Sequence, residues 1–428
     1  MKQAGNKIGP DNGFQIVTDS CDNIYITGNF TGQAQFGDSI VTANNDDCYV
    51  AKYSRNGDLI WLRTFGGKGS QTGNTIALQS NGDIIVAGNF NNELIINDTI
   101  LKSNWSDIFL IKMNSFGQIQ WYKTFGNGQF NDINKIKFDS ENNLYAVGRI
   151  SDTISVDNKL IVSHGQVDGY ILKLDYDANL IWFHVIGGID DDETNNLSLD
   201  NHDNVYISGK CSYKVFIDSD SLKTTDFSSS YLAKFSKTGD LLIFKTYGEE
   251  LLTETWDITN DYEGNLYITG FHCGTIKIDN VTYPSAPEMS YAMFIAKLND
   301  KVELVWFKHY FSTGNSYGHS VNIDSNNSCY LFGTFYQDIK INRKKYKSKD
   351  KSGSVILKFN ANGDLDTYKI FVGKGSVDFW SGYLSKTSNY LYTTGSFTNC
   401  YQFDKLNTFC TESDKDILIM KQDKNLKK

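Results

Sequence analysis

Short apolar runs bounded by polar turn residues return along the whole chain. Residues 73–132 show the pattern: positions 74–78 alternate, 80–83 form a turn, and further runs follow at 84–90, 107–112 and 118–123. Such short runs, separated by Gly, Asn, Asp and Ser, predict β-strands, and nothing between them has helical periodicity. The pattern therefore predicts four strands joined by turns as an antiparallel meander. The longer segment between the second and third strands predicts a protruding hairpin or loop.

The four-strand pattern recurs seven times with a period of about sixty residues. Repetition at a fixed period of this size is typical of repeat architectures. A tyrosine, or once an isoleucine, stands three residues before a marker glycine in every copy, a hydrophobic residue follows eight residues after it, and a lysine comes further on in the third strand. The marker glycines are Gly28, Gly88, Gly148, Gly209, Gly270, Gly333 and Gly395.

One four-stranded sheet cannot bury both faces, so neighbouring copies must stack on each other. Radial closure leaves only short, protected edges, whereas open β-solenoids usually have shorter coils and parallel strands. We therefore expect an all-β fold, a seven-bladed β-propeller of four-stranded antiparallel blades with about 61 residues per repeat. It forms one domain, 1–428, and the repeats are approximately 13–72, 73–132, 133–193, 194–254, 255–317, 318–378, and 379–428 together with 1–12.

The two ends of the array favour a closed ring. The last copy stops after its third strand, and residues 3–5 precede the first copy where a fourth strand would end. We expect residues 1–5 to pair with residues 416–421 and so complete the last blade, with strand one nearest the axis. The marker glycines would admit a neighbouring sheet or strand, and the tyrosines would pack between sheets with their hydroxyl groups hydrogen-bonded.

Five segments of the first copy carry a family resemblance. Residues 19–28, 36–37, 47–52, 57–61 and 65–67 read DSCDNIYITG, FG, DCYVAK, GDLIW and FGG. This order resembles the SBBP-type bacterial β-propeller repeat, and the likeness extends over essentially the whole chain. The third-strand Asp departs from that pattern at Ser229, Ala292 and Gly353. The resemblance implies the fold and often an exported bacterial protein, but no particular activity, because fold does not determine function.

Composition limits the partners and the cellular location that we expect. The net charge of -9 argues against nucleic-acid binding, and no apolar run approaches the roughly 18 residues of a membrane span. The first residues lack the apolar core of a signal peptide. We expect a monomer that is extracellular or on the cell surface, with any leader absent from this chain; the alternative is a cytoplasmic protein. Seven cysteines lack CxxC spacing, and a bridge between Cys400 and Cys410 is left open.

Most conspicuous polar residues have a structural interpretation. The Asp at the turn before strand two is expected to accept backbone N–H groups, and the third-strand lysines are expected to pack and form ion pairs. No HxH, HExxH or GxSxG motif occurs, so no catalytic residue is assigned. The recurring turn residues are Asp19, Asp139, Asp200, Asp261 and Asp324.

The segments entering strand one should converge at the mouth of a propeller, where ligands often bind. Two and four residues before a marker position in strand one, the residue type varies while the surrounding frame repeats. The strand-one markers are Ile16, Ile76, Ile136, Leu197, Ile258, Val321 and Gly382. The candidate ligand-binding residues at these positions are Asp132, Glu193, Glu254, Tyr317, His319, Asp378, Trp256 and Trp380. Neighbouring acidic residues would deepen the negative field, and the gathered carboxylates would raise one another's pKa. These neighbours are Asp190, Asp191, Asp192, Glu249 and Glu250.

Three ligand classes suit such a mouth: a cation, with Ca²⁺ as the possible cofactor, a sugar, or a peptide. The alternative is a hydrated rim with the tryptophans packed between blades. We expect a non-enzymatic recognition or scaffold protein that binds a protein or glycan. The competing hypothesis is a carbohydrate-active enzyme in which two rim carboxylates act as acid and base.

Overall fold

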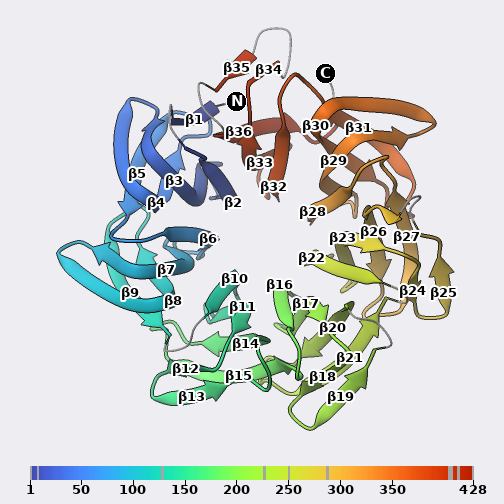
Figure 1. Cartoon of the computed structure of the whole chain (residues 1–428), viewed down its shortest axis with the longest axis horizontal. Helices are drawn as coiled ribbons and strands as arrows, with labels where there is room; N and C mark the ends of the chain where they lie inside the picture. Colours follow the sequence, from blue (N-terminus) through green and yellow to red (C-terminus); the bar gives the residue numbers. More distant parts are fainter. Residues whose placement is uncertain are drawn as a thin grey trace. The chain divides into compact units, whose positions relative to one another are not determined.

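The computed structural model describes residues 2–6, 9–126, 130–224, 228–248, 251–285, 289–402, 408–411 and 415–426. The described part of the chain is built of β-strands and contains no α-helix (Figure 1). Nor does it include a helix long and apolar enough to span a membrane. The chain divides into two compact units: unit 1 comprises Met1–Ile133 with Phe371–Lys428, and unit 2 comprises Asn134–Ile370.

Unit 1 contains a four-stranded sheet and an eight-stranded sheet. The four-stranded sheet has the order β6 (Gln71–Leu78), β7 (Ile84–Ile96), β8 (Thr99–Met113) and β9 (Ile119–Phe125). The larger sheet has the order β32 (Val377–Leu384), β33 (Tyr390–Phe397), β36 (Asp416–Asp423), β1 (Lys2–Asn6), β3 (Ile24–Phe36), β4 (Ser39–Tyr53) and β5 (Leu59–Phe65). Its eighth strand, β2 (Asn12–Thr18), also pairs with β3, and β34 (Cys400–Gln402) forms a separate hairpin with β35 (Thr408–Cys410).

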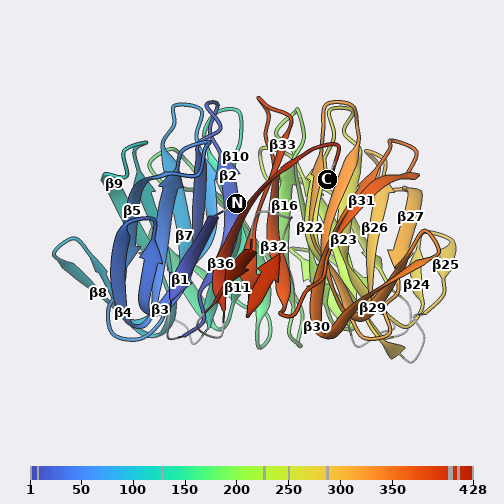
Figure 2. The same ribbon diagram turned by 90° about the horizontal axis from the view of Figure 1, so that it is seen from above.

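Strand β1 lies between the last strands of the chain and the first (Figure 2). Residues 2–4 pair antiparallel with residues 417–419 of β36, and residues 5–6 pair with residues 34–35 of β3. The predicted pairing of the N-terminal segment with residues 416–421 is therefore confirmed for residues 2–4.

Unit 2 contains sheets of the same antiparallel type. One has the order β16 (Glu193–Leu199), β17 (Val205–Cys211), β20 (Ser229–Phe235) and β21 (Leu241–Tyr247). The next is β22 (Leu252–Asn260), β23 (Leu266–Cys273), β26 (Ala292–Leu298) and β27 (Leu304–Tyr310), and another is β28 (Ser316–Ile323), β29 (Cys329–Ile341), β30 (Lys344–Phe359) and β31 (Leu365–Phe371). A six-stranded sheet has the order β10 (Asn131–Phe138), β11 (Leu144–Ile150), β14 (Asp168–Leu174), β15 (Leu180–Gly187), β18 (Lys214–Ile217) and β19 (Asp220–Lys223); the first three residues of β10 belong to unit 1.

The long segment between the second and third strands forms a hairpin, as predicted. In unit 2 it is a separate two-stranded sheet in β12 (Thr153–Val156) with β13 (Lys159–Val162), and in β24 (Ile276–Ile278) with β25 (Val281–Tyr283). In three repeats the hairpin continues the long strands β3 and β4, β7 and β8, or β29 and β30, whereas the hairpin of β18 and β19 pairs with β15. The predicted hydrophobic residue Phe403 lies outside the described residues.

The hydrophobic core lies between successive sheets within each unit. In unit 2, β16 contacts β22, and β22 contacts β28, so the first strands of these sheets lie next to one another (Figure 1). Buried Ile258 and Ile268 of one sheet pack in the same cluster as Tyr206 and Leu232 of the sheet before it. Because each sheet supplies apolar side chains to its neighbour, the alternating pattern of the sequence is satisfied by stacking.

The turn aspartates are structural residues, as predicted. Oδ1 of Asp139 accepts the backbone N–H groups of Glu141 and Asn143, at 3.0 and 2.8 Å. Its Oδ2 lies 3.0 Å from Nζ of Lys173, which also stands 4.8 Å from the ring centre of Tyr145. The same trio recurs as Asp19, Lys52 and Tyr25, as Asp200, Lys234 and Tyr206, and as Asp261, Lys297 and Tyr267.

Tryptophans of the fourth strands bind the next sheet. Nε1 of Trp61 donates to the carbonyl of Ser115, at 3.1 Å, in the turn between β8 and β9. In unit 2, Trp182 donates to the carbonyl of Lys237 at 3.3 Å, and the two residues are 55 positions apart against 54 for Trp61 and Ser115. The repeated residues therefore hold the frame together, which leaves the non-repeating positions as candidates for function.

Candidate ligand-binding site

First strands carry a β-bulge at one of the positions that varies between repeats. In β22, Thr255 pairs with Gly270 and Asp257 pairs with Thr269, so Trp256 is the extra residue. A bulge takes its extra residue out of the ladder and re-aims its side chain. The corresponding bulge residues are Phe14, Asn74, Asn195, His319 and Trp380.

The marker glycine stands opposite this bulge, where no side chain fits. A Cβ added to Gly270 would overlap the carbonyl group of Glu254 in the neighbouring strand. The same overlap would occur at Gly209 with the carbonyl group of Glu193. The expected close approach is thus confirmed, and it comes from strand one of the same sheet.

Three asparagines, each two residues before the strand-one marker of its repeat, connect neighbouring sheets. Nδ2 of Asn134 donates to the carbonyl of Thr194 at 3.0 Å, and Nδ2 of Asn195 donates to that of Thr255 at 3.1 Å. In unit 1, Asn74 makes the same bond to the carbonyl of Ile133 at 2.9 Å. At these positions the variable residue has a structural role.

In β22 and β28 the bulge residues are aromatic and form a cluster instead. The ring of Trp256 stacks on Tyr317 with a centroid distance of 5.3 Å and an interplanar angle of 6°. Trp256 also meets Phe271 edge-on at 5.0 Å and lies 5.1 Å from the ring of His319. Burial lowers the pKa of His319 to about 3, so this ring is neutral at physiological pH. Trp256 and Tyr317 remain partly exposed, whereas Phe271 is buried.

Two glutamates with cationic neighbours flank these rings. Oε2 of Glu254 accepts a hydrogen bond from Nε1 of Trp256 at 3.0 Å, and Oε1 of Glu193 lies 2.8 Å from Nη1 of Arg149. Burial raises the pKa of Glu254; the bond from Trp256 and the charge of Lys210 oppose this rise, while Glu193 adds to it. The predicted rise in pKa is confirmed for Glu254, but its main cause is burial rather than repulsion.

Six partly exposed residues of unit 2 make up what we call the aromatic–acidic site: Arg149, Glu193, Lys210, Glu254, Trp256 and Tyr317. Sequence reasoning missed Arg149 and Lys210. Each directly follows a marker glycine, and Lys210 pairs with Glu193 across β16 and β17. Comparing the residue after the marker glycine across the repeats would have found both.

The remaining candidates lie in unit 1. Trp380 meets the ring of Phe14 edge-on at 6.4 Å, and its Nε1 donates to Oγ of Ser396 at 3.4 Å. Asp378 is buried, and Asp132 is partly exposed on β10. That these three residues join those of unit 2 at one opening stays a prediction.

One acidic neighbour was wrongly placed at the surface. Asp192 is fully buried, and it accepts the N–H groups of Gly188 at 2.7 Å and Ser212 at 2.9 Å. It therefore caps backbone groups and contributes no exposed carboxylate. Asp191 is exposed and Asp190 partly so, while Glu249 and Glu250 lie outside the described residues.

The described residues contain no group of three or more His, Cys, Asp or Glu side chains placed to hold a metal ion. Cys400 and Cys410 form a disulfide that joins β34 to β35, which settles the bridge left open by the sequence.

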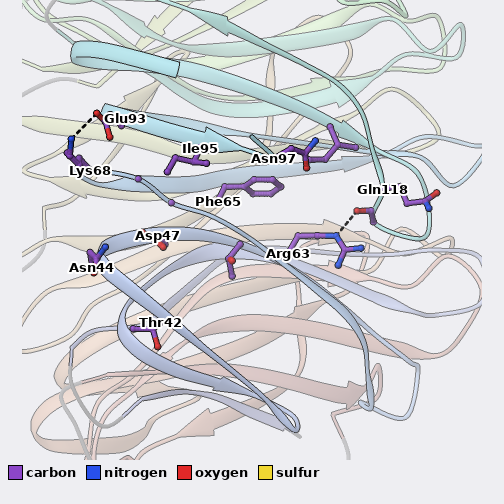
Figure 3. A pocket seen from close by; sticks show the side chains of 15 residues that line it. Thr42, Asn44, Asp47, Arg63, Phe65, Lys68, Glu93, Ile95, Asn97 and Gln118 are labelled. Carbon is purple, nitrogen blue, oxygen red and sulfur yellow. Dashed lines mark hydrogen bonds and ion pairs between the residues drawn. The ribbon is translucent and has the colours of Figure 1, made fainter. Parts of the chain in front are cut away.

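A separate cavity of about 860 Å³ lies in unit 1, lined by β4, β5, β7 and the turn between β8 and β9 (Figure 3). Nζ of Lys68 lies 3.2 Å from Oε1 of Glu93, and Nε of Arg63 donates to the carbonyl of Gly117 at 2.8 Å. Its lining comes partly from the protruding hairpins, so the strand-one comparison carried no signal for it.

No family model matches the chain. An uncharacterized WD repeat-containing protein of Acanthamoeba polyphaga mimivirus is 25% identical over 370 residues, which covers 67% of this chain and 26% of that protein. The chain thus spans about a quarter of the length of this curated relative.

Among solved structures, polysaccharide lyase Uly1 is similar with a TM-score of 0.51 and 8% identity, covering 96% of this chain and 90% of that one. Sqt1 from Chaetomium thermophilum has a TM-score of 0.46 and 9% identity, covering 90% and 94%. WD repeats form blades of four-stranded sheets. Together with the stacked four-stranded sheets, the WD-repeat relative indicates that this chain has an all-β, propeller-like fold.

Proposed function

We propose that this protein is a non-enzymatic recognition module that binds its partner at the aromatic–acidic site. One observation carries the proposal: where β16 uses a bulge asparagine to bind the next sheet, β22 presents Trp256, stacked on Tyr317 and hydrogen-bonded to Glu254. A repeat frame that changes from a structural amide to partly exposed aromatic and charged groups marks a surface for binding. The frame itself we take to be a seven-bladed ring completed through β1.

The chemistry of the site suits a glycan or a protein segment. Partly exposed indole and phenol rings offer apolar contact area, and both rings also carry polar groups. Arg149 and Lys210 supply donors, and Glu193 and Glu254 supply acceptors, within the same site. Such a mixture of aromatic surface and a few charged groups is typical of specific binding sites.

We further propose a monomeric protein that works outside the cell or on its surface. The disulfide between Cys400 and Cys410 supports this, because disulfides persist in oxidising compartments. The resemblance to the SBBP-type repeat favours the same location.

The test is a screen against immobilised glycans and proteins, followed by calorimetry on each ligand found. Replacing Trp256 with Ala should weaken binding at least tenfold, because aromatic anchors at interface centres contribute roughly 2 kcal/mol or more. Asn74→Ala alters the equivalent bulge residue of unit 1 and serves as the control with unchanged affinity. An affinity that survives Trp256→Ala combined with Glu254→Gln would place the binding surface elsewhere.

A carbohydrate-active enzyme is the second candidate, favoured by the raised pKa of Glu254 near Glu193. A carboxyl group whose pKa is raised by burial can act as a general acid, and a nearby carboxylate can act as a base. The likeness to a polysaccharide lyase concerns the fold alone. If a polysaccharide is turned over, and Glu254→Gln abolishes turnover while binding is kept, this candidate replaces the first.

A further inference from the structure

The cavity of unit 1 contains a carboxylate oxygen that lacks a hydrogen-bond donor. Asp47 of β4 lines this cavity of about 860 Å³, and a Cβ added to Gly66 would overlap its carboxyl group, so the side chain packs against the backbone after β5 (Figure 3). Oδ1 of Asp47 is buried and has no hydrogen-bond partner among the described residues. Burial, reinforced by the charge of Asp46, raises the pKa of Asp47 to about 6. Buried polar atoms in proteins are nearly always hydrogen-bonded, so Oδ1 is an acceptor suited to a donor from a bound molecule.

The aspartates at the equivalent third-strand position of other repeats receive hydrogen bonds. Oδ2 of Asp168 accepts the backbone N–H groups of His164 and Gly165, the latter at 3.2 Å. Oδ2 of Asp416 accepts a hydrogen bond from Nε2 of Gln3 at 2.6 Å. In these repeats the chain itself therefore supplies the donor, from a loop in one case and from β1 in the other.

Comparison with the next repeat shows which residue is missing at Asp47. β4 and β8 have the same length and the same sequence of buried and exposed residues, so Ala43 of β4 occupies the position of Ser103 in β8. Burial raises the pKa of Asp107, and a side-chain hydrogen bond with Ser103 opposes the rise. The methyl group of Ala43 is buried and cannot donate. Asp47 therefore lacks the hydroxyl group that Asp107 receives from its own strand.

Charged side chains of both signs line the same cavity. Nε and Nη1 of Arg63 donate to the carbonyl groups of Gly117 and Leu62 at 2.8 and 2.9 Å, and these bonds use two of the five N–H groups of a guanidinium. Nζ of Lys68 lies 3.2 Å from Oε1 of Glu93, and the Lys68 side chain is 81% exposed. With the carboxyl group described above, the lining contains two cationic and two acidic side chains. This balance disfavours both an anion and a cation as the ligand.

Uncharged groups complete the lining. The amides of Asn44, Asn97 and Gln118 each offer both donors and an acceptor. Ile95, which is 40% exposed, and Ile119, which is partly exposed, provide apolar surface. The cavity therefore suits a neutral molecule that carries many groups able both to donate and to accept, together with some apolar C–H surface.

We propose that the cavity of unit 1 binds a neutral saccharide, one hydroxyl group of which donates to Oδ1 of Asp47. A sugar hydroxyl both donates and accepts, so it supplies the missing hydrogen bond while other hydroxyl groups accept from Arg63 and the amides. The C–H groups of the sugar ring contact the two isoleucines. The volume of about 860 Å³ falls within the range of small-molecule sites, roughly 300–1,000 Å³. This site shares no residue with the aromatic–acidic site of unit 2.

An array of neutral mono-, di- and trisaccharides, followed by calorimetry with each saccharide that binds, tests the proposal. Ala43→Ser gives Asp47 the hydroxyl group that Ser103 gives Asp107. It should weaken saccharide binding about tenfold or more, because the serine competes for a hydrogen bond to a charged group. The same substitution should keep or raise the melting temperature, since it satisfies a buried acceptor. Ala43→Gly changes the same position without adding a donor and should leave the affinity unchanged.

Thr64→Trp is the second variant, and it decides the matter if Ala43→Ser does not fold. Thr64 is exposed on β5 and lines the cavity, so an indole there occupies space needed by the saccharide without entering the core. Binding should again weaken about tenfold or more. The proposal is overturned if no saccharide of the array binds, or if every bound saccharide keeps its affinity in the folded variants. It is also overturned if methylammonium chloride binds more tightly than every saccharide, because Asp47 would then hold a cation.

Discussion

At the scale of single residues, the repeat separates two kinds of polar side chain. Asp139, Lys173 and Tyr145 form a buried trio that returns from sheet to sheet, and it explains the recurring turn aspartate without any chemistry. Glu254 and Trp256 belong to the other kind, because they occupy positions where the repeat frame stays and the residue type changes. A polar residue that is exposed and departs from the repeat is therefore a candidate for function, whereas a buried polar residue that recurs belongs to the framework.

The marker glycine of the site gives a sharp test at this scale. Gly270→Ala should lower the free energy of unfolding by about 1–3 kcal/mol, because the added Cβ overlaps the carbonyl group of Glu254. It should also displace the bulge that holds Trp256, so ligand binding weakens in parallel. Gly264→Ala, where the nearest atom is 3.8 Å from the new Cβ, provides the comparison, although its φ of +83° adds some strain. Urea unfolding of both variants measures the difference; equal losses would contradict the overlap.

At the scale of strands and sheets, side-chain amides and indoles connect neighbours that share few backbone bonds. Asn134 and Asn195 each reach the carbonyl of the next first strand, and Trp182 reaches the next hairpin turn. Stability therefore accumulates from interfaces between adjacent sheets, as expected for repeat proteins.

Asn195→Ala should cost about 1 kcal/mol of unfolding free energy, the usual net contribution of one hydrogen bond plus the penalty of an unpaired carbonyl at Thr255. Chemical denaturation provides the measurement. Asn201→Ala, which removes an exposed bond to the carbonyl of Tyr262, should cost less. A larger loss in the exposed variant would argue against the partly buried amides as the connections between sheets.

Much of the fold follows from the sequence because its determinants are local. Turn residues and alternating runs lie within a few positions of each other, so strands, hairpins and turn aspartates could be predicted. The asparagine bonds and the burial of Asp192 depend on the backbone of a neighbouring sheet about sixty residues away, which the pattern does not show. Arg149 and Lys210 were missed for a similar reason, since their importance arises from pairing across strands.

At the scale of the whole molecule, β1 joins the last strands of the chain to the first ones in the eight-stranded sheet. It separates β36 from β3, and buried Ala4 stands opposite Ile417. Replacing Ala4 with Asp should therefore lower the melting temperature by several degrees, because a charge enters the interior without a partner.

Ala4→Ser is the matched control and should change the melting temperature much less. Differential scanning calorimetry of the two variants decides the matter. A thermally silent Ala4→Asp would show that pairing through β1 contributes little to stability.

The position of β1 has a consequence for biosynthesis. Gln3 bonds to Asp416, a contact between residues 413 positions apart, so β1 is synthesised long before the strand with which it pairs. Contacts of such long sequence separation form slowly, and an unpaired strand edge invites association with other chains. Until β36 is made, the edge of β1 that will pair with it is open to neighbouring nascent chains. The eight-stranded sheet can close only after β36 has been synthesised, so the interval between the synthesis of β1 and that of β36 is the one in which this chain most needs protection from aggregation.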